Sequence, residues 1–139
     1  MKEKECIELM RLRVPARWAV TYNQFYDVDP ISNPDSEYGM YKNWDYFTED
    51  ILQIVKTDFM DGDPGIAKNH LLIDLGYYPE GKEEGAYGLQ LVFKDKEQGW
   101  LELAEFDSKD RYEIRNKMEE WMEKLILADS YEEALCYAP

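Results

Sequence analysis

Two segments of the chain place a large apolar residue at every second position, and this pattern constrains the fold most. The segments are residues 69–77 and 87–94, and their shared apolar face consists of Leu71, Ile73, Leu75, Tyr77, Leu89, Leu91 and Phe93. A period of two is typical of strands with one buried and one wet face. Turn-forming residues fill 79–85 and 95–99, and a third strand is expected over 100–106. The sequence therefore predicts antiparallel neighbours.

Two further strands are expected nearer the N-terminus. Residues 17–26 predict a strand because Trp18, Val20 and Tyr22 alternate with smaller or more polar residues. Pro30 and Pro34 interrupt that pattern, so residues 27–47 form a long connection with a short helix near its end. Residues 48–55 suit either a strand or a helix, and we favour a strand. The run at 61–65, Asp-Gly-Asp-Pro-Gly, predicts a turn.

A helix is expected after Asp107 and Ser108, and either side chain can cap its free N–H groups. Its apolar residues recur at intervals of three and four, which gives a single apolar stripe. The stripe consists of Ile114, Met118, Trp121, Met122 and Leu125. Two pairs of opposite charge are spaced for contact on the outer face, namely Glu113 with Lys117 and Glu120 with Lys124.

Ser130 and Glu133 match a capping box, which predicts a short final helix over residues 131–135. A sheet with one apolar face and a helix with one apolar stripe bury those surfaces against each other. The predicted fold is α+β, an antiparallel β-meander of about five strands with a C-terminal helix packed on one face. A single domain accounts for residues 1–139, and residues 1–12 need not pack tightly against it.

The charge of the chain is unevenly distributed. Residues 1–20 carry a net charge of +2, whereas residues 21–139 carry 11 Lys and Arg against 27 Asp and Glu, a net charge of −16. Because 45% of the residues are hydrophobic, the acidic part folds rather than forming a disordered tail. An acidic body attracts basic protein surfaces and repels phosphate backbones and anionic membranes. We expect a basic protein partner, no nucleic acid and no membrane; the oligomeric state stays open.

The sequence also bears on the cellular compartment. It contains no apolar run near the ~20 residues that cross a bilayer, and its charged N-terminus does not look like a signal peptide. These features predict a cytoplasmic protein. Cys6 and Cys136 lie near opposite ends of the chain, and in a reducing compartment we expect two free thiols.

Residues that carry catalytic chemistry do not form a recognisable motif. His70 is the only histidine, and its place before an apolar run is typical of the first residue of a strand. The acidic segments 27–29 and 58–63 lack the alternating ligands of a calcium loop, and turn residues are the commoner explanation. We therefore predict no catalytic residue, no cofactor and no metal.

The connection at residues 26–47 is the strongest candidate for a binding surface, because it interleaves aromatic rings with carboxylates. Rigid rings supply contact area, and carboxylates recognise Arg and Lys. The candidate partner-binding residues are Tyr26, Asp27, Asp29, Asp35, Glu37, Tyr38, Tyr41, Trp44, Asp45 and Tyr46. The alternative is that these rings cover a sheet edge and fill the core. Tyr77, Tyr78 and Tyr87, around the acidic turn 80–84, would extend the same surface.

Three segments resemble small bacterial immunity-type proteins of polymorphic toxin systems. They are Pro-Ala-Arg-Trp-Ala-Val at 15–20 with Phe-Tyr-Asp-Val-Asp-Pro at 25–30, Asp-Leu-Gly-Tyr-Tyr-Pro-Glu-Gly at 74–81, and the run at 106–115 that leads into Trp121. The resemblance implies a small, acidic, cytosolic protein that neutralises a cognate toxin by binding it. Such families share no catalytic residues, so the resemblance assigns no site.

These observations favour a non-enzymatic, acidic protein-binding module, an immunity-type inhibitor that neutralises a basic toxin domain. Two alternatives stay open. One is an acidic nucleic-acid mimic that inhibits a DNA- or RNA-binding enzyme, which predicts carboxylates spaced like phosphates over one face. The other is a small carboxylate-dependent enzyme, which predicts a pocket with two acids and a perturbed pKa.

Overall fold

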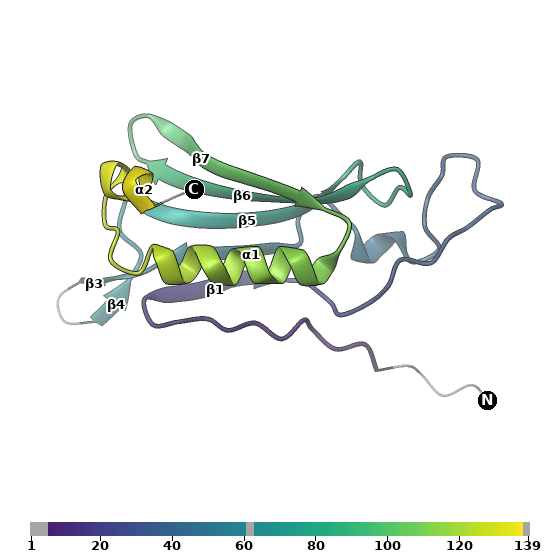
Figure 1. Cartoon of the computed structure of the whole chain (residues 1–139), viewed down its shortest axis with the longest axis horizontal. Helices are drawn as coiled ribbons and strands as arrows, with labels where there is room; N and C mark the ends of the chain where they lie inside the picture. Colours follow the sequence, from purple (N-terminus) through teal and green to yellow (C-terminus); the bar gives the residue numbers. More distant parts are fainter. Residues whose placement is uncertain (1–5, 61–62, 138–139) are drawn as a thin grey trace.

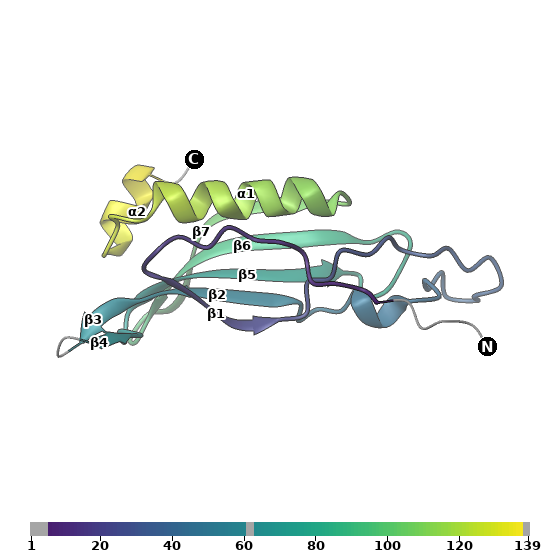
Figure 2. The same cartoon turned by 90° about the horizontal axis from the view of Figure 1, so that it is seen from below.

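The structure is a computed structural model that describes residues 6–60 and 63–137. It has two layers, a five-stranded antiparallel sheet and two helices on one side of it (Figures 1 and 2). The sheet order is β1-β2-β5-β6-β7, for β1 Trp18–Asn23, β2 Leu52–Lys56, β5 His70–Tyr78, β6 Ala86–Asp95 and β7 Gly99–Ser108. The helices are α1 Arg111–Lys124 and α2 Tyr131–Tyr137. This arrangement confirms the predicted α+β meander.

A separate hairpin interrupts the meander between β2 and β5. It consists of β3 Asp58–Met60 and β4 Asp63–Gly65, which pair antiparallel. The turn predicted at 61–65 falls partly on residues 61 and 62, which lie outside the described residues. A short 3-10 helix, η1 Trp44–Tyr46, ends the connection at the place expected.

The core lies between the sheet and α1. The alternating apolar residues of β5 and β6 are all buried in it, as the period of two predicts. The five residues of the helix stripe face them, and each is at most 1% exposed. Full burial of one such side chain stabilises a protein by roughly 1.5–3 kcal/mol, so this contact layer dominates the stability of the fold.

A bulge in β1 corrects the predicted alternation of Trp18, Val20 and Tyr22. Trp18 is buried, and its indole Nε1 donates to the carbonyl oxygen of Met122 at 3.0 Å. The register shifts between Val20 and Tyr22, so Tyr22 pairs with Gln53. The bulge inserts one extra residue, which moves Tyr22 to the face of the sheet opposite Trp18.

The first turn of α1 is also capped differently from the prediction. Asp110 is the N-cap, and its Oδ1 accepts from the backbone N–H of Tyr112 at 2.8 Å. Ser108 instead accepts from the N–H of Asp110 and donates to Glu113. Lys117 pairs with Glu120 at 3.0 Å rather than with Glu113.

The remaining helix predictions agree with the structure. Lys124 pairs with Glu120 at 3.1 Å, as the i,i+4 spacing predicts. The N–H of Glu133 donates to the Ser130 hydroxyl at 3.1 Å, which confirms the capping box of α2. No helix in the described part of the chain is long and apolar enough to cross a membrane.

Residues 6–12 run beside residues 25–27. Met10 is buried in the core, and its N–H donates to the carbonyl oxygen of Phe25 at 2.7 Å. The N–H of Asp27 donates in turn to the carbonyl oxygen of Glu8 at 2.8 Å. Cys6 and Cys136 are both exposed free thiols.

Candidate functional site

Residues 26–47, here called the aspartate–tyrosine loop, extend beyond one end of the sheet (Figure 1). Backbone and side-chain hydrogen bonds fasten the loop to itself and to the body. Tyr41 N–H donates to the carbonyl oxygen of Gly81 at 2.8 Å. The Asn43 amide donates to the Asp29 carbonyl oxygen and accepts from the N–H of Ile31, both at 2.9 Å. These contacts hold the loop in one conformation.

Three of the tyrosines predicted to bind a partner are buried or half-buried. Tyr41 is buried, and its hydroxyl lies 2.7 Å from that of Tyr77, which donates to the Gly85 carbonyl oxygen at 3.0 Å. Burial, together with the hydrogen bond from Tyr41, raises the pKa of Tyr77. Tyr26 and Tyr46 are half-buried and meet edge to face, with ring centroids 5.2 Å apart. The positions of these three rings fit the alternative interpretation, in which they cover a sheet edge and fill the core.

Two of the predicted carboxylates contact α1. The Arg111 guanidinium donates to Asp27 at 2.8 Å and to Asp29 at 2.6 Å. The Tyr112 hydroxyl donates to Asp27 at 3.0 Å. These bonds hold the pKa of Asp27 below its ordinary value. Because Asp27 and Asp29 both accept hydrogen bonds from Arg111 of α1, they attach the base of the loop to the helix.

The other five predicted residues lie on the outside of the loop. Tyr38 is 75% exposed and Trp44 is 48% exposed. Three exposed acids accompany them, and no described residue forms an ion pair with any of the three. We call these five residues the outer loop residues: Asp35, Glu37, Tyr38, Trp44 and Asp45.

A second acidic surface, which the sequence analysis did not identify, is the sheet face turned away from the helices (Figure 2). We call it the open sheet face. Asp74 points to it because its neighbours Ile73 and Leu75 point into the core. Cross-strand partners share a face, which places Glu102, Glu105 and Asp107 there opposite Val92, Gln90 and Gly88. In the described part of the chain, none of these acids forms an ion pair.

Both edge strands carry a bulge that moves a side chain onto the open sheet face. In β1 the bulge places Tyr22 there. In β7 the register shifts between Leu91 and Val92, so Glu102 faces the same way as Glu105 although the two are an odd number of positions apart in the strand. Bulges re-aim side chains in this manner. The alternating pattern of β5 predicts that Asp74 lies on the face opposite the core, because it stands between Ile73 and Leu75. Nothing in the local sequence predicts the two bulges.

The Tyr78 side chain lies over Gly76 of β5 and Gly88 of β6 on the open sheet face. A Cβ atom at Gly76 would come within 2.5 Å of the Tyr78 hydroxyl, and one at Gly88 within 3.1 Å of its ring. The hydroxyl donates to the Glu49 carbonyl oxygen at 3.2 Å. The two glycines therefore form a bed for this ring, because their lack of side chains lets it lie directly on the backbone of the sheet. Tyr78 is 47% exposed.

Two hollows lie on the open sheet face. The first, of about 360 Å³, includes Tyr22, Asp50 and Asp74 in its lining. The second, of about 430 Å³, includes Tyr78 with Glu105 and Asp107. Each hollow thus combines one tyrosine with two carboxylates.

Two carboxyls on this face have a pKa above the ordinary value. Partial burial, and then the nearby charge of Asp50, raise the pKa of Asp74. A hydrogen bond with Glu102 and repulsion from it raise the pKa of Glu105. A neighbouring carboxylate contributes to each shift, which shows that like charges lie close together on the open sheet face.

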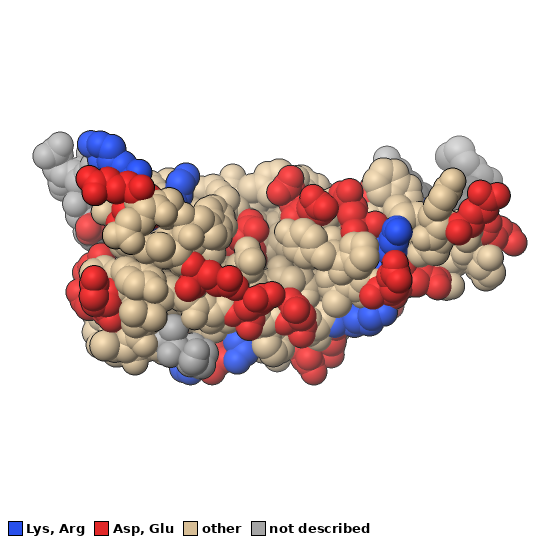
Figure 3. All heavy atoms as spheres, turned by 90° about the horizontal axis from the view of Figure 1, so that it is seen from above, with Lys and Arg blue, Asp and Glu red and all other residues tan. Residues whose placement is uncertain are grey.

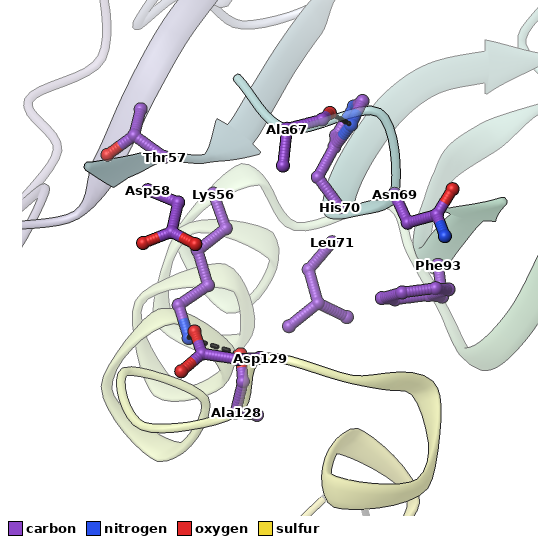
Figure 4. Close-up of a pocket in the computed structure, with 10 residues that line it drawn as sticks. All are labelled: Lys56, Thr57, Asp58, Ala67, Asn69, His70, Leu71, Phe93, Ala128 and Asp129. Atoms are coloured by element: carbon purple, nitrogen blue, oxygen red, sulfur yellow. Dashed lines mark hydrogen bonds and ion pairs between the residues drawn. The ribbon is translucent and has the colours of Figure 1, made fainter. Parts of the chain in front are cut away.

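His70 lines a different and much smaller pocket beside the connection from α1 to α2 (Figure 4). Its Nδ1 lies 2.9 Å from the Ala67 carbonyl oxygen. The Lys56 ammonium donates to the Ala128 carbonyl oxygen and lies 3.6 Å from Asp129. Burial lowers the pKa of Lys56. The pocket of about 30 Å³ admits only a water or two, so its charges serve to fasten the connection.

Metal ligands do not come together in the described part of the chain: no three His, Cys, Asp or Glu side chains form a set that would hold an ion. Asp27 and Asp29 bind Arg111, and Asp61 of the other acidic segment lies outside the described residues. Comparison with known proteins adds no relative, since no family model, curated protein or solved structure matches the chain.

Proposed function

We propose that this protein is a non-enzymatic, cytoplasmic binding module that neutralises a basic protein domain through the outer loop residues. The observation that carries the proposal is that Tyr38 and Trp44 are exposed beside three carboxylates without an ion pair among the described residues. Aromatic anchors are enriched at protein interfaces, and charges around them favour partners of complementary charge. The resemblance to immunity-type proteins supports a toxin domain as the target.

The charge and the fastened loop suggest how binding proceeds. A net charge of −14 attracts a basic partner and accelerates encounter, with an effect that decreases as salt is added. Tyr38 and Trp44 then exclude water and slow dissociation. Because Arg111 and Asn43 hold the loop before binding, little conformational entropy is lost when the partner docks.

The distribution of acids favours this proposal over a nucleic-acid mimic. A mimic needs carboxylates in a row spaced like phosphates on one face. Along the face shown in Figure 3, Asp and Glu are spread over the whole length of the molecule, with a few Lys and Arg among them. Further acids lie on the outer loop and on the helices, which matches no single nucleic-acid track.

A carboxylate-dependent enzyme is the second candidate. The observation in its favour is the hollow that brings Asp50 near Asp74, whose pKa is raised. Paired carboxylates work best where water is excluded. The hollow lies on an uncovered sheet face, so we place this candidate behind the binding module.

Capture of the partner from the native host tests the proposal. The tagged protein should retain a basic protein whose toxicity it suppresses, and Asp35→Lys with Glu37→Lys should reduce that capture at least about tenfold, since like charges then face each other. Glu123→Lys with Glu132→Lys is the matched control, because both glutamates are exposed on the helices. Equal capture by both double variants would contradict the assignment of the surface.

A further inference from the structure

We propose that the open sheet face is a second docking surface, which receives two arginine or lysine side chains of the basic partner, one in each hollow. The proposal rests on the proposed function for the existence of that partner, but it concerns a different surface from the outer loop residues. Both α1 and α2 lie on the opposite side of the sheet from this face (Figure 2). The occupant is a segment of the partner with basic residues about 10 Å apart.

The first hollow fits a cationic side chain by charge and by shape. Asp50 and Asp74 supply two carboxylates, and the Tyr22 ring supplies an aromatic wall. A guanidinium forms paired hydrogen bonds with carboxylates and stacks on an aromatic ring, so one arginine satisfies both features. Its charge would also offset the repulsion between Asp50 and Asp74, which adds to the effect of burial on the pKa of Asp74.

The second hollow repeats this chemistry on the other side of Tyr78. Glu105 and Asp107 supply the carboxylates, and the Tyr78 ring on its glycine bed supplies the wall. Glu102 lies on the same face and adds a further negative charge. An alanine at Gly88 would place its methyl group 3.1 Å from the Tyr78 ring, so glycine leaves the ring low on the sheet and the hollow open.

The register of the sheet sets the separation of the two hollows. The first lies over β2 and β5, and the second over β6 and β7. Adjacent strands are about 4.8 Å apart, so the centres of the hollows are roughly 10 Å apart. A polyproline II segment repeats its side chains on one side every three residues, or about 9.3 Å. Basic residues at positions i and i+3 of such a segment would reach both hollows.

The probe for this proposal is the blocked peptide acetyl-(Arg-Pro-Pro)₃-amide, titrated into the whole protein and followed by NMR. We expect backbone amide shifts centred on Gln53, Asp74, Gln90 and Glu105. Asp74→Asn with Glu105→Gln should weaken binding about fivefold, the loss expected for two partly exposed ion pairs. The same peptide with citrulline in place of arginine keeps its shape but lacks charge, and it should not bind.

Two matched variants separate this proposal from the proposed function. Glu123→Gln with Glu132→Gln removes two charges from the helices and should change peptide affinity less than twofold. Trp44→Ser should leave peptide binding unchanged while it impairs capture of the partner. Shifts spread equally over the acids of the loop and helices, or equal losses in the two double variants, would overturn the second docking surface and leave the outer loop assignment standing.

Discussion

The two faces of the sheet are built from the same strands but differ in chemistry, although the open sheet face also buries Val55, Leu72 and Val92. The face under α1 is formed by the apolar positions of β5 and β6, which are almost completely buried. The open sheet face carries Asp74, Glu102, Glu105 and Asp107 without an ion pair among the described residues. The covered face therefore contributes most of the apolar core, and the open sheet face concentrates carboxylates beside a smaller apolar area. The comparison suggests that stability and recognition can be altered separately in this protein.

The largest expected effect on stability comes from a substitution at the sheet face that α1 covers. Trp121→Ala should lower the free energy of unfolding by about 3–5 kcal/mol, because it removes a large side chain that is 1% exposed and leaves a cavity. Urea unfolding measures the change. Trp121→Phe is the matched control, since the indole Nε1 has no hydrogen-bond partner among the described residues. Trp121→Phe should lower the free energy of unfolding by less than half as much as Trp121→Ala, because an aromatic ring still fills most of the site. Equal losses would show that the buried ring volume is not what stabilises this contact.

A second test concerns carboxylates that serve the fold. Arg111→Met should lower the free energy of unfolding by about 1–2 kcal/mol, because Asp27 and Asp29 lose a charged donor. It should also accelerate amide hydrogen exchange in residues 26–47. Lys124→Met breaks an exposed pair with Glu120 and should cost less than about 0.5 kcal/mol. Unchanged exchange in the loop would show that Arg111 does not fasten it.

The smallest test compares one carboxylate of each kind as the pH changes. The lowered pKa of Asp27 stabilises the fold above about pH 4, and this contribution is lost as the pH falls through the folded-state pKa. The raised pKa of Asp74 affects stability in the opposite direction. Asp74 favours the folded state below about pH 4, and this contribution is lost as the pH rises through its folded-state pKa. At pH 7, Asp27→Asn should destabilise and Asp74→Asn should stabilise, each by less than about 1 kcal/mol. Urea unfolding that gives both changes the same sign would contradict the distinction between the two surfaces.

The parts of the fold that depend on local spacing were predictable from the sequence. Leu71, Ile73 and Leu75 alternate within one strand, and their burial follows from that period. The helix stripe and the Ser130 capping box are local in the same sense. Each of these predictions requires knowledge of only a few neighbouring residues.

The candidate site was less predictable because its residues meet across the chain. Asp27 binds Arg111, 84 residues away, and Tyr41 meets Tyr77, so neither contact has a local signal. The bulges that place Tyr22 and Glu102 on the open sheet face depend on the register with neighbouring strands. Composition and spacing identified a loop rich in carboxylates and rings but could not separate its inner members from its outer ones.

The bulges in β1 and β7 also affect how copies of the protein meet at high concentration. An exposed edge strand is a template for strands of other molecules, and long flat edges lead to aggregation. Both edges of this sheet are bent by an extra residue, and the β7 edge carries Glu102 and Glu105. A second copy would have to match an irregular register against like charges. The two irregular, partly acidic edges therefore disfavour strand pairing between copies of the protein.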